Sequence, residues 1–126
     1  MNTPNELKYT KDHEWARIDG EYLYVGITDY AQGELGEIVY VDVNTEGEKL
    51  DAEEVFGSIE AVKTVSDLML PVEGEVVEFN TELEDHPEYV NEDPYGKGWI
   101  IKMVPVNKED YDSLMSSDEY NSMLAK

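Results

Sequence analysis

The sequence predicts a mainly β fold with a few short helices and a helical C-terminal tail. Short runs rich in β-branched and aromatic residues alternate with turn residues along most of the 126-residue chain. The composition is 40% hydrophobic and 10% aromatic, which is enough for a folded core. The length fits a single domain, 1–126, with a β body at about 7–105 and helices at about 107–124.

The first predicted elements are a hairpin and a short helix. Asp19-Gly20 stands between two β-rich runs, and this dipeptide is a strong hairpin signal. We therefore expect strands at 13–19 and 22–27. Thr28 then occupies the position of a helix N-cap and predicts one or two helical turns as far as Leu35.

The next predicted strand covers 36–43, where apolar and polar residues alternate around Val39, Val41 and Val43. The residues at 46–49 predict a turn. The strand also begins a weak repeat, because the pattern Gly-Glu-Ile-Val-Tyr-Val at 36–41 returns as Gly-Glu-Val-Val-Glu-Phe at 74–79. Such a repeat is expected of a β sandwich built from two similar halves.

Two further β-rich runs, 55–62 and 65–70, lie on either side of Lys63-Thr64. They predict a hairpin with Lys63 at its tip. Pro71 and Gly74 punctuate the chain after this hairpin, and strands follow at 76–79 and 99–104.

The tail predicts two capped helices. Asn107 with Asp110 and Ser116 with Glu119 have the spacing of capping boxes. Each is followed by apolar residues at helical spacing, namely Tyr111, Leu114 and Met115, then Tyr120, Met123 and Leu124. These helices either cover one side of the β body or dock a partner.

Composition excludes several classes of function. The chain has no cysteine, which excludes disulfides, thiolate metal sites and a catalytic thiol, and fits a reducing compartment. With Asp+Glu 30 against Lys+Arg 9, the net charge is −21, so nucleic acid and anionic membranes are poor partners. Basic protein surfaces are favoured partners.

The chain also lacks the usual membrane and export signals. No apolar run is long enough for a membrane-spanning helix, and residues 1–6 have no signal-peptide pattern. We expect a cytoplasmic protein that acts as a monomer.

Lys63 is the only lysine or arginine between Lys49 and Lys97. All fourteen acids of that interval surround it in sequence: Asp51, Glu53, Glu54, Glu60, Asp67, Glu73, Glu75, Glu78, Glu82, Glu84, Asp85, Glu88, Glu92 and Asp93. A hairpin tip would hold its amine clear of the sheet, where an enzyme can acylate it and attach a long arm. The ordinary alternative is a surface lysine paired with Glu60 or Asp67.

The sequence resembles the H protein family of the glycine cleavage system over about 7–105, and more loosely in the tail. The motifs occur in order, and their number makes the resemblance specific. They are Tyr9-Thr10-Lys11-Asp12-His13-Glu14-Trp15, Gly26-Ile27-Thr28-Asp29-Tyr30-Ala31-Gln32, Leu35-Gly36-Glu37-Ile38-Val39-Tyr40-Val41, Glu60-Ala61-Val62-Lys63, Ser66-Asp67, Pro71-Val72-Glu73-Gly74-Glu75-Val76, Asn91-Glu92-Asp93-Pro94-Tyr95 and Gly98-Trp99-Ile100-Ile101-Lys102.

The resemblance implies a lipoyl-domain-like fold, a flattened β-barrel or hybrid sandwich, with lipoate in amide linkage to Lys63. It places Glu60 and Gly74 where lipoyl carriers are recognised by the lipoate-attaching enzyme. Gly74 also has an ordinary interpretation, as a turn glycine after Pro71. Ala61 and Asn44 depart from the residues common in the family, Ser and Pro, and neither departure affects Lys63.

The resemblance also implies a carrier subunit without catalytic activity of its own. Its lipoyl arm takes the aminomethyl group from glycine decarboxylase, a pyridoxal-phosphate enzyme, to aminomethyltransferase, and dihydrolipoyl dehydrogenase reoxidises it. The cofactor brings the chemistry and the protein the tether. Glu14 and Asp67, with Asp12, match acids that line a cleft around the loaded arm.

Three alternatives remain open. A biotin carrier also uses a hairpin lysine, but it typically flanks that lysine with methionines, where this chain has Val62 and Thr64. A hydrolase with paired carboxylates lacks any supporting nucleophile or phosphate loop. A lipoyl relay that donates lipoate to other proteins fits equally well. His13 and His86 are too few and too far apart to predict a metal site.

Overall fold

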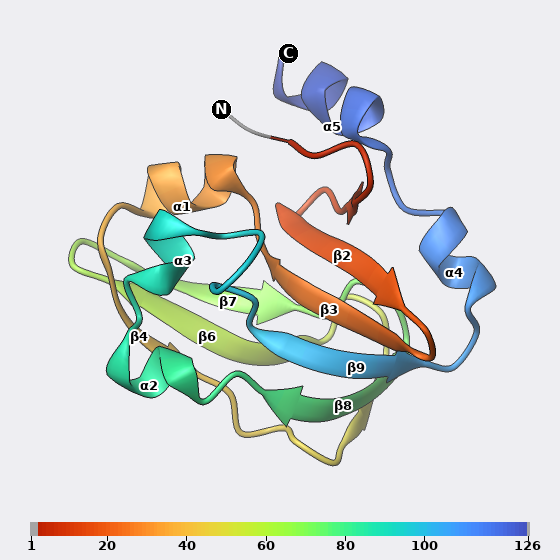
Figure 1. The fold of residues 1–126 in the computed structure, drawn as a ribbon, viewed down its shortest axis with the longest axis horizontal. Coiled ribbons are helices and arrows are strands. Elements are labelled where there is room, and N and C mark those ends of the chain that lie inside the picture. Colours follow the sequence, from red (N-terminus) through yellow and green to blue (C-terminus); the bar gives the residue numbers. More distant parts are fainter. Residues whose placement is uncertain (1–2, 126) are drawn as a thin grey trace.

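The computed structural model describes residues 3–125, so Met1, Asn2 and Lys126 lie outside the described residues. Strands form two antiparallel sheets (Figure 1). The larger sheet has the order β1-β2-β3-β9-β8-β5. Its strands are β1 (Lys8–Tyr9), β2 (Glu14–Asp19), β3 (Tyr22–Ile27), β9 (Ile101–Pro105), β8 (Gly74–Phe79) and β5 (Lys49–Leu50).

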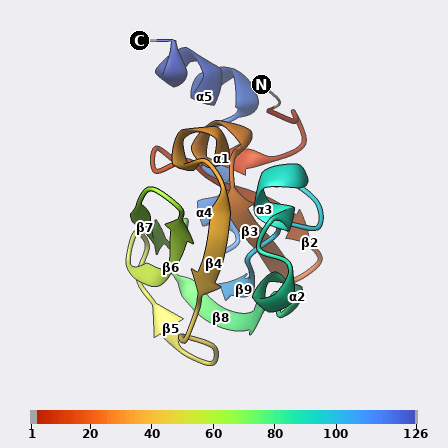
Figure 2. The same ribbon diagram turned by 90° about the vertical axis from the view of Figure 1, so that its left-hand side faces the viewer.

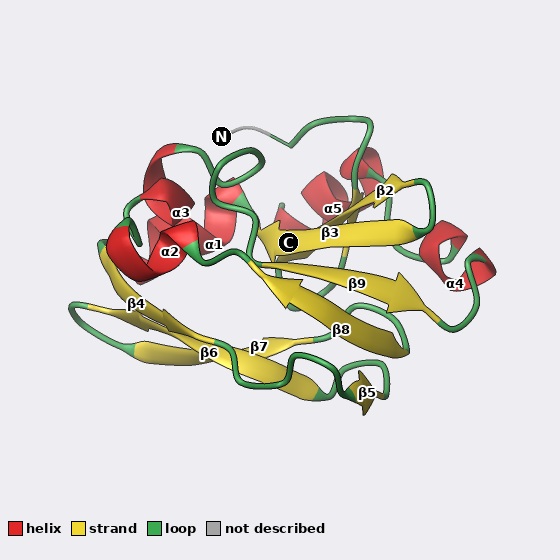
Figure 3. Ribbon diagram, turned by 60° about the horizontal axis from the view of Figure 1, so that its bottom comes forward, coloured by secondary structure: helices red, strands yellow, loops and turns green. Residues whose placement is uncertain are grey.

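The smaller sheet has the order β4-β6-β7, and its strands are β4 (Ile38–Asp42), β6 (Val55–Ala61) and β7 (Val65–Met69). It faces the larger sheet across the core (Figure 3). Both sheets supply fully buried side chains to this core, among them Leu23, Ile101, Phe56 and Ile59. Burial of this apolar surface is the main force that holds the two sheets together. The predicted mainly β fold is confirmed.

The hairpin of β2 and β3 is confirmed, with Asp19 paired to Tyr22 across the two-residue turn. Gly20 has φ +63° there, a conformation that glycine adopts without a steric penalty. The hairpin of β6 and β7 is also confirmed. The two-residue strands β1 and β5 were not predicted, because such short pieces carry no periodicity.

The alternation predicted for the strand at 36–43 is wrong. In β4, Ile38 and Val41 are buried, whereas Val39 and Tyr40 are exposed. A register shift between Ile38 and Tyr40 marks a β-bulge, which puts one extra residue on the strand. The buried residues Ile38 and Val41 are therefore three positions apart, where a regular strand would have them two apart.

The repeat has a structural counterpart. In β8 the register shifts between Val76 and Glu78, at the same place in the second copy as in the first. Val76 and Phe79 are buried, as are Ile38 and Val41. The two copies are therefore bulged strands of the same design, one in each sheet.

The helices are short. They are α1 (Asp29–Leu35), α2 (Glu82–Asp85), α3 (Tyr89–Glu92), α4 (Glu109–Asp112) and α5 (Ser117–Leu124). Helices α1, α2 and α3 gather at one end of the sheets (Figures 1 and 2). Helices α2 and α3 were not predicted. No helix of residues 3–125 is both long and apolar enough to cross a membrane.

Two of the predicted helix caps are confirmed. The Thr28 side chain accepts a hydrogen bond from Ala31 N, and Ser116 with Glu119 forms a reciprocal capping box. The predicted box at Asn107 is wrong. Asn107 Oδ1 accepts from Glu109 N at 3.0 Å, but Lys108 is the N-cap and makes no side-chain capping bond.

The tail covers one edge of the β body. The Tyr120 ring of α5 stacks on Tyr9 of β1, with ring centroids 4.9 Å apart. Both rings are fully buried in a small second cluster with Trp15. Tyr9 and Met115 exchange backbone hydrogen bonds of 2.8 and 2.9 Å. The covering role expected of the tail is therefore visible in the structure.

Candidate functional site

Lys63 lies in the turn between β6 and β7, which protrudes beyond the neighbouring strands (Figure 1). The last strand pair is Glu60 with Val65, and Ala61 N donates to Thr64 O at 2.7 Å. Lys63 is exposed, and its neighbour Val62 is 71% exposed. The turn thus presents its amine to solvent, as the sequence predicted.

The end of α1 supports this turn. Gly36 ends the helix with φ +80°, and a Cβ on it would meet Lys63 Cε at 3.5 Å. Val62 N donates to Glu37 O at 3.0 Å. Among residues 3–125 no ion pair includes Lys63, so the ordinary alternative of a pairing with Glu60 or Asp67 is not seen.

Asn91 of α3 supports the base of the same turn through three side-chain hydrogen bonds. Its Nδ2 donates to Gly36 O at 2.8 Å and to Gln32 Oε1 at 3.0 Å, and its Oδ1 accepts from Ile38 N at 2.9 Å. One side chain therefore joins the end of α1 to the start of β4. In the sequence, only the presence of Asn91 in a family motif pointed to this residue.

A cavity of about 280 Å³ lies between α1, β7 and the loop before β2. The three predicted acids, Asp12, Glu14 and Asp67, all line it. The rest of the lining is His13, Ile27, Tyr30, Ala31, Glu34, Leu35, Ile59, Ser66 and Leu68. The structure therefore brings together acids that are more than fifty residues apart in sequence, and does so beside the hairpin that carries Lys63.

Glu14 is the buried acid of this cavity, only 2% exposed. Its Oε1 accepts from Thr10 Oγ1 at 3.0 Å and its Oε2 from Met69 N at 3.3 Å. Burial raises the pKa of Glu14 to about 8, against the lowering effect of these two hydrogen bonds. A buried carboxyl with a pKa near neutrality is typical of functional sites, and a cation brought beside it would favour its ionised form.

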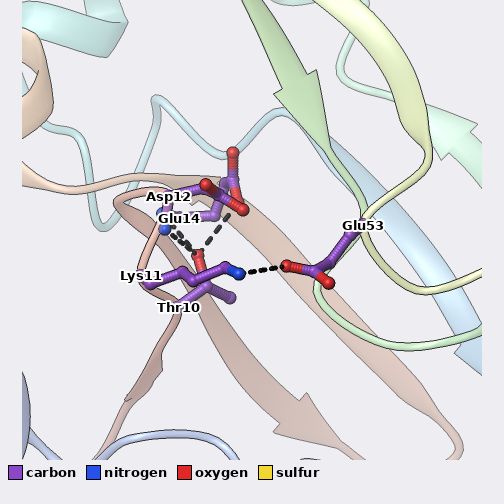
Figure 4. Close-up of polar contacts among 5 residues, drawn as sticks. All are labelled: Thr10, Lys11, Asp12, Glu14 and Glu53. Atoms are coloured by element: carbon purple, nitrogen blue, oxygen red, sulfur yellow. Dashed lines mark hydrogen bonds and ion pairs between the residues drawn. The ribbon is translucent and has the colours of Figure 1, made fainter.

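The loop before Glu14 is fixed on its outer side (Figure 4). Thr10 Oγ1 accepts from the backbone N–H of Asp12 and of Glu14, both at 3.2 Å. Lys11 Nζ lies 3.0 Å from Glu53 Oε1, in an ion pair that is largely exposed and adds little stability. Thr10 therefore orients both Asp12 and Glu14, two of the acids that line the cavity.

Asp67 has a different place from Glu14. It pairs with Ser58 in β7 and β6, and it is exposed while the next residue, Leu68, is buried. Since side chains alternate along a strand, Asp67 lies at the rim of the cavity and not inside it. Asp12 is half-buried.

The two residues expected to guide lipoate attachment are not together. Glu60 is exposed, three residues before Lys63. Gly74 is buried at the start of β8, paired with Leu50 and Pro105, at the far end of the sheets (Figure 1). A Cβ there would collide with the Val104 carbonyl oxygen, so Gly74 is a close-packed strand glycine. Its interpretation as a turn residue is wrong.

The histidines have structural contacts. His13 Nδ1 lies 2.7 Å from Tyr120 Oη, which is also 2.8 Å from Thr28 Oγ1. Burial lowers the pKa of His13. His86 lies 3.0 Å from a carboxylate oxygen of Glu88. Within residues 3–125 no group of three His, Cys, Asp or Glu side chains could hold a metal ion.

Tyr120 is a residue that sequence reasoning placed in the tail but not near the cavity. Its hydroxyl joins α5 to His13, which lines the cavity, and to Thr28, which caps α1. His13 itself has φ +70°, a strained conformation for a residue other than glycine. Only the contact between segments more than a hundred residues apart could have indicated this role.

Comparison with known proteins agrees with this arrangement. The family model of the glycine cleavage H-protein matches residues 7–126. The glycine cleavage system H protein of Bacteroides fragilis is 60% identical over 124 residues, 98% of each chain. That of Geobacillus kaustophilus is 53% identical over 124 residues, also 98% of each chain. The chain belongs to the glycine cleavage H-protein family.

A solved H protein from Mycobacterium marinum shares the fold, with a TM-score of 0.88 and 37% identity over 98% of this chain and all of that one. Members of this family are lipoyl carrier subunits and not enzymes, as the resemblance implied. The alternative of a hydrolase is therefore wrong, and lipoate is favoured over biotin.

The residues present fit an attached arm. The Lys63 amine is exposed at a protruding turn, and no described side chain forms an ion pair with it. The cavity beside the hairpin combines apolar walls, including Ile27, Leu35 and Ile59, with one buried carboxyl. An apolar chain with a cationic end is the ligand that such a cavity suits.

Proposed function

We propose that this chain carries lipoate on Lys63 and moves an aminomethyl group from glycine decarboxylase to aminomethyltransferase. Attached to Lys63, lipoate would supply a disulfide able to accept the group, and dihydrolipoyl dehydrogenase would restore that disulfide. The observation that carries the proposal is the meeting of Asp12, Glu14 and Asp67 around one cavity beside the Lys63 hairpin.

The chain's own residues contribute position and protection. The turn holds the Lys63 amine away from the sheet, so that the arm is free to move between partners while it remains at a high effective concentration. Gly36, Glu37 and Asn91 fix the base of that turn. A firm base limits the volume that the arm explores.

Glu14 is proposed to hold the terminal ammonium of the loaded arm. Before an ammonium approaches, the carboxyl, with its pKa at about 8, keeps its proton at neutral pH. An ammonium beside it lowers that pKa, so Glu14 gives up the proton and accepts a charge-assisted hydrogen bond. Such a sheltered bond contributes about 1.5–3 kcal/mol. Asp12 and Asp67 add negative charge at the entrance.

The net charge of the chain also fits a carrier that diffuses between partner enzymes. A net charge of −21 keeps the chain soluble and speeds its association with basic surfaces on larger partners. We propose that it acts in the cytoplasm as a monomer, modified by a lipoate-attaching enzyme.

The test has two stages. The intact mass of protein from its native cell, with peptide mapping, should show a lipoyl increment on Lys63. The loaded wild type and the loaded Glu14→Gln variant should then be compared for release of ammonia and formaldehyde. A lost bond of 1.5–3 kcal/mol corresponds to release that is roughly 10 to 100 times faster. Equal rates at every salt concentration would remove Glu14 from the mechanism.

A further experiment with the purified partner enzymes separates the two carrier functions. A chain that is lipoylated but cannot be loaded by a glycine decarboxylase, while it donates lipoate to other proteins, would be a relay. A chain that is loaded and unloaded by the three enzymes would be the glycine cleavage carrier.

A further inference from the structure

Thr10 uses the full hydrogen-bonding capacity of its hydroxyl group. A hydroxyl can donate one hydrogen bond and accept two. Thr10 Oγ1 accepts from the backbone N–H of Asp12 and from that of Glu14, both at 3.2 Å (Figure 4). Its single hydrogen therefore remains for Glu14 Oε1, which lies 3.0 Å away. The backbone thus fixes the direction of this bond, in which Thr10 donates and Glu14 accepts.

Backbone hydrogen bonds hold Thr10 in this position. Thr10 N donates to Glu14 O at 2.9 Å, and His13 N donates to Thr10 O at 3.1 Å. The loop closes through His13, whose φ of +70° is a strained conformation for a residue other than glycine. The Thr10 hydroxyl cannot turn away from Glu14 unless two backbone N–H groups lose their acceptor.

Both hydrogen bonds of the Glu14 carboxyl favour its charged form. The second bond comes from Met69 N, 3.3 Å from Oε2, and a backbone N–H can only donate. A protonated carboxyl has a hydrogen of its own to donate, and neither Thr10 nor Met69 can accept it. Burial raises the pKa of Glu14 to about 8, while these two bonds lower it. The donors therefore oppose burial and keep the ionised form within reach near neutral pH.

Thr10 approaches Glu14 from outside the cavity proposed for the arm. A second cavity, of about 330 Å³, is lined by Thr10, Asp12 and Glu14 together with apolar residues such as Leu70. Glu14 and Asp12 line both cavities, whereas Thr10 lines only the second. The carboxyl therefore stands between the two cavities. Its donor takes up none of the space proposed for the arm.

The other titratable groups around Glu14 do not replace this donor. Within the described residues 3–125, none of them forms a hydrogen bond or ion pair with the Glu14 carboxyl. Lys11 Nζ is paired with Glu53 at 3.0 Å, and the charges of Asp12 and Glu53 raise the pKa of Glu14 further. These groups come from every element packed against the acid, and they are Tyr9, Lys11, Asp12, His13, Tyr30, Glu34, Glu53, Asp67 and Tyr120.

We propose that Thr10 is a positioning residue for Glu14, a fixed donor that orients the carboxyl and favours its ionised form when the cationic end of the arm arrives. This inference rests on the proposed function. Ionisation breaks the Glu14 O–H bond, the proton passes to water, and the oxygen keeps the electron pair. The carboxylate then accepts hydrogen bonds from Thr10, from Met69 and from the ammonium. Without the Thr10 donor the carboxylate is less stable, so the ammonium is held less firmly.

The first measurement uses the whole unmodified chain with 13C-labelled glutamate carboxyls and follows the Glu14 resonance against pH. Glu14→Gln identifies that resonance. We expect Thr10→Val to raise the midpoint of the Glu14 titration by roughly one to two pH units, because a hydrogen bond to a charged group is lost. Thr10→Ser keeps the hydroxyl and should retain the wild-type midpoint. Thr45→Val is the matched control, because the hydroxyl of this half-buried threonine donates to Phe56 O at 2.7 Å.

The second measurement compares release of ammonia and formaldehyde from the loaded chains. A midpoint higher by about one pH unit makes the carboxylate roughly tenfold harder to form, so Thr10→Val should release roughly tenfold faster than wild type. Added to Glu14→Gln, Thr10→Val should have no further effect, because Thr10 acts through the carboxyl. Thr10→Cys has a weaker donor of similar size and replaces Thr10→Val if that variant does not fold. Its midpoint should lie between those of Thr10→Ser and Thr10→Val.

Three results would overturn the inference alone. They are an unchanged titration midpoint in Thr10→Val, a raised midpoint in Thr10→Ser, and faster release from the double variant than from Glu14→Gln. The last of these would make Thr10 a structural residue of the loop. The proposed function survives all three if loaded Glu14→Gln still releases faster than wild type. Equal release from loaded wild type and Glu14→Gln would overturn the proposed role of Glu14 and this inference with it.

Discussion

The Lys63 turn and the Glu14 cavity place ionisable groups in opposite surroundings. Lys63 is exposed on a turn, and Val62 and Val65, which lie close to it in sequence, are 71% and 64% exposed. Glu14 is 2% exposed, accepts two hydrogen bonds and has its pKa raised to about 8 by burial. The first group is suited to reach other proteins, and the second is suited to hold a charge away from water.

Helix α1 connects the two regions. At its start Thr28 caps the helix and contacts Tyr120, and along its length Ala31 and Leu35 line the cavity of Glu14. At its end Gly36 lies against the Lys63 side chain. One short helix therefore sets the position of the tether relative to the cavity, which a swinging arm needs if it is to find its resting place.

The largest expected effect concerns the exposed region. Lys63→Arg should abolish lipoate attachment, because a guanidinium is not acylated as an amine is, while it keeps the positive charge. The melting temperature should change by less than about 3 °C, since surface substitutions are usually within about 0.5 kcal/mol. Lys49→Arg, an exposed lysine of β5, is the control and should be modified normally. A lipoyl increment that persists on Lys63→Arg would assign the arm to another lysine.

The second prediction concerns the buried region and is a pH effect. The pKa of Glu14 is about 8 in the folded chain, above the ordinary value of 4.5 expected when unfolded. Its contribution to stability is therefore complete below about pH 4.5 and is lost as pH rises to about 8. Glu14→Gln removes this loss, so the variant should gain on wild type across that interval. The gain should be on the order of 2–4 kcal/mol at pH 8, since one pKa unit corresponds to about 1.4 kcal/mol.

Chemical unfolding of both proteins at several pH values measures this difference. The other acids titrate alike in the two proteins and cancel in the comparison. Parallel stability curves between pH 5 and 8 would mean that Glu14 is ionised in the folded chain, and that water reaches it. The contrast between the two regions would then disappear.

The third prediction concerns Asn91, whose side chain joins the end of α1 to the start of β4 at the base of the Lys63 turn. Asn91→Ala removes the hydrogen bonds to Gly36 O, Gln32 Oε1 and Ile38 N. We expect a loss of about 2 kcal/mol of stability and slower lipoate attachment, because the base of the turn is loosened. Asn121→Ala is the control, because Asn121 is an exposed asparagine hydrogen-bonded to Thr3 and should cost less than about 0.5 kcal/mol. Lower stability with unchanged attachment would show that the turn keeps its geometry without Asn91.

The two regions also differ in how far the sequence could predict them. The Lys63 hairpin is local, since its strands and its lone lysine lie within fifteen residues, and both were predicted. The cavity is assembled from β2, α1 and β7 and was indicated only by the family resemblance. Its supporting residues, Thr10 and Tyr120, could not be found, because their contacts depend on how distant segments pack. The bulge in β4 was missed because one inserted residue cancels the period of two.

The smallest expected effect tests whether charge near Lys63 acts at a distance or by contact. Glu60 is exposed, faces Tyr40 and Val65 across the strands, and forms no ion pair among residues 3–125. Glu60→Gln should therefore leave the melting temperature nearly unchanged and lower kcat/KM for lipoate attachment roughly three- to tenfold. Glu78→Gln, at the place of Tyr40 in the repeat but on the other sheet, is the control for the loss of one charge. The Glu78 carboxylate is exposed and lies 3.8 Å from Lys102 Nζ, a weak ion pair.

Salt distinguishes the two modes of action. If Glu60 acts only through the general field, both variants should lose the same small amount, and the loss should vanish at high ionic strength. If it makes a direct contact with a basic side chain of the enzyme, the effect of Glu60→Gln should exceed that of Glu78→Gln and persist in part at high salt, because a contact sheltered in an interface is screened less. A fall in stability together with attachment would instead make Glu60 a structural residue of the hairpin, and the exposed region would then resemble the buried one in depending on its packing.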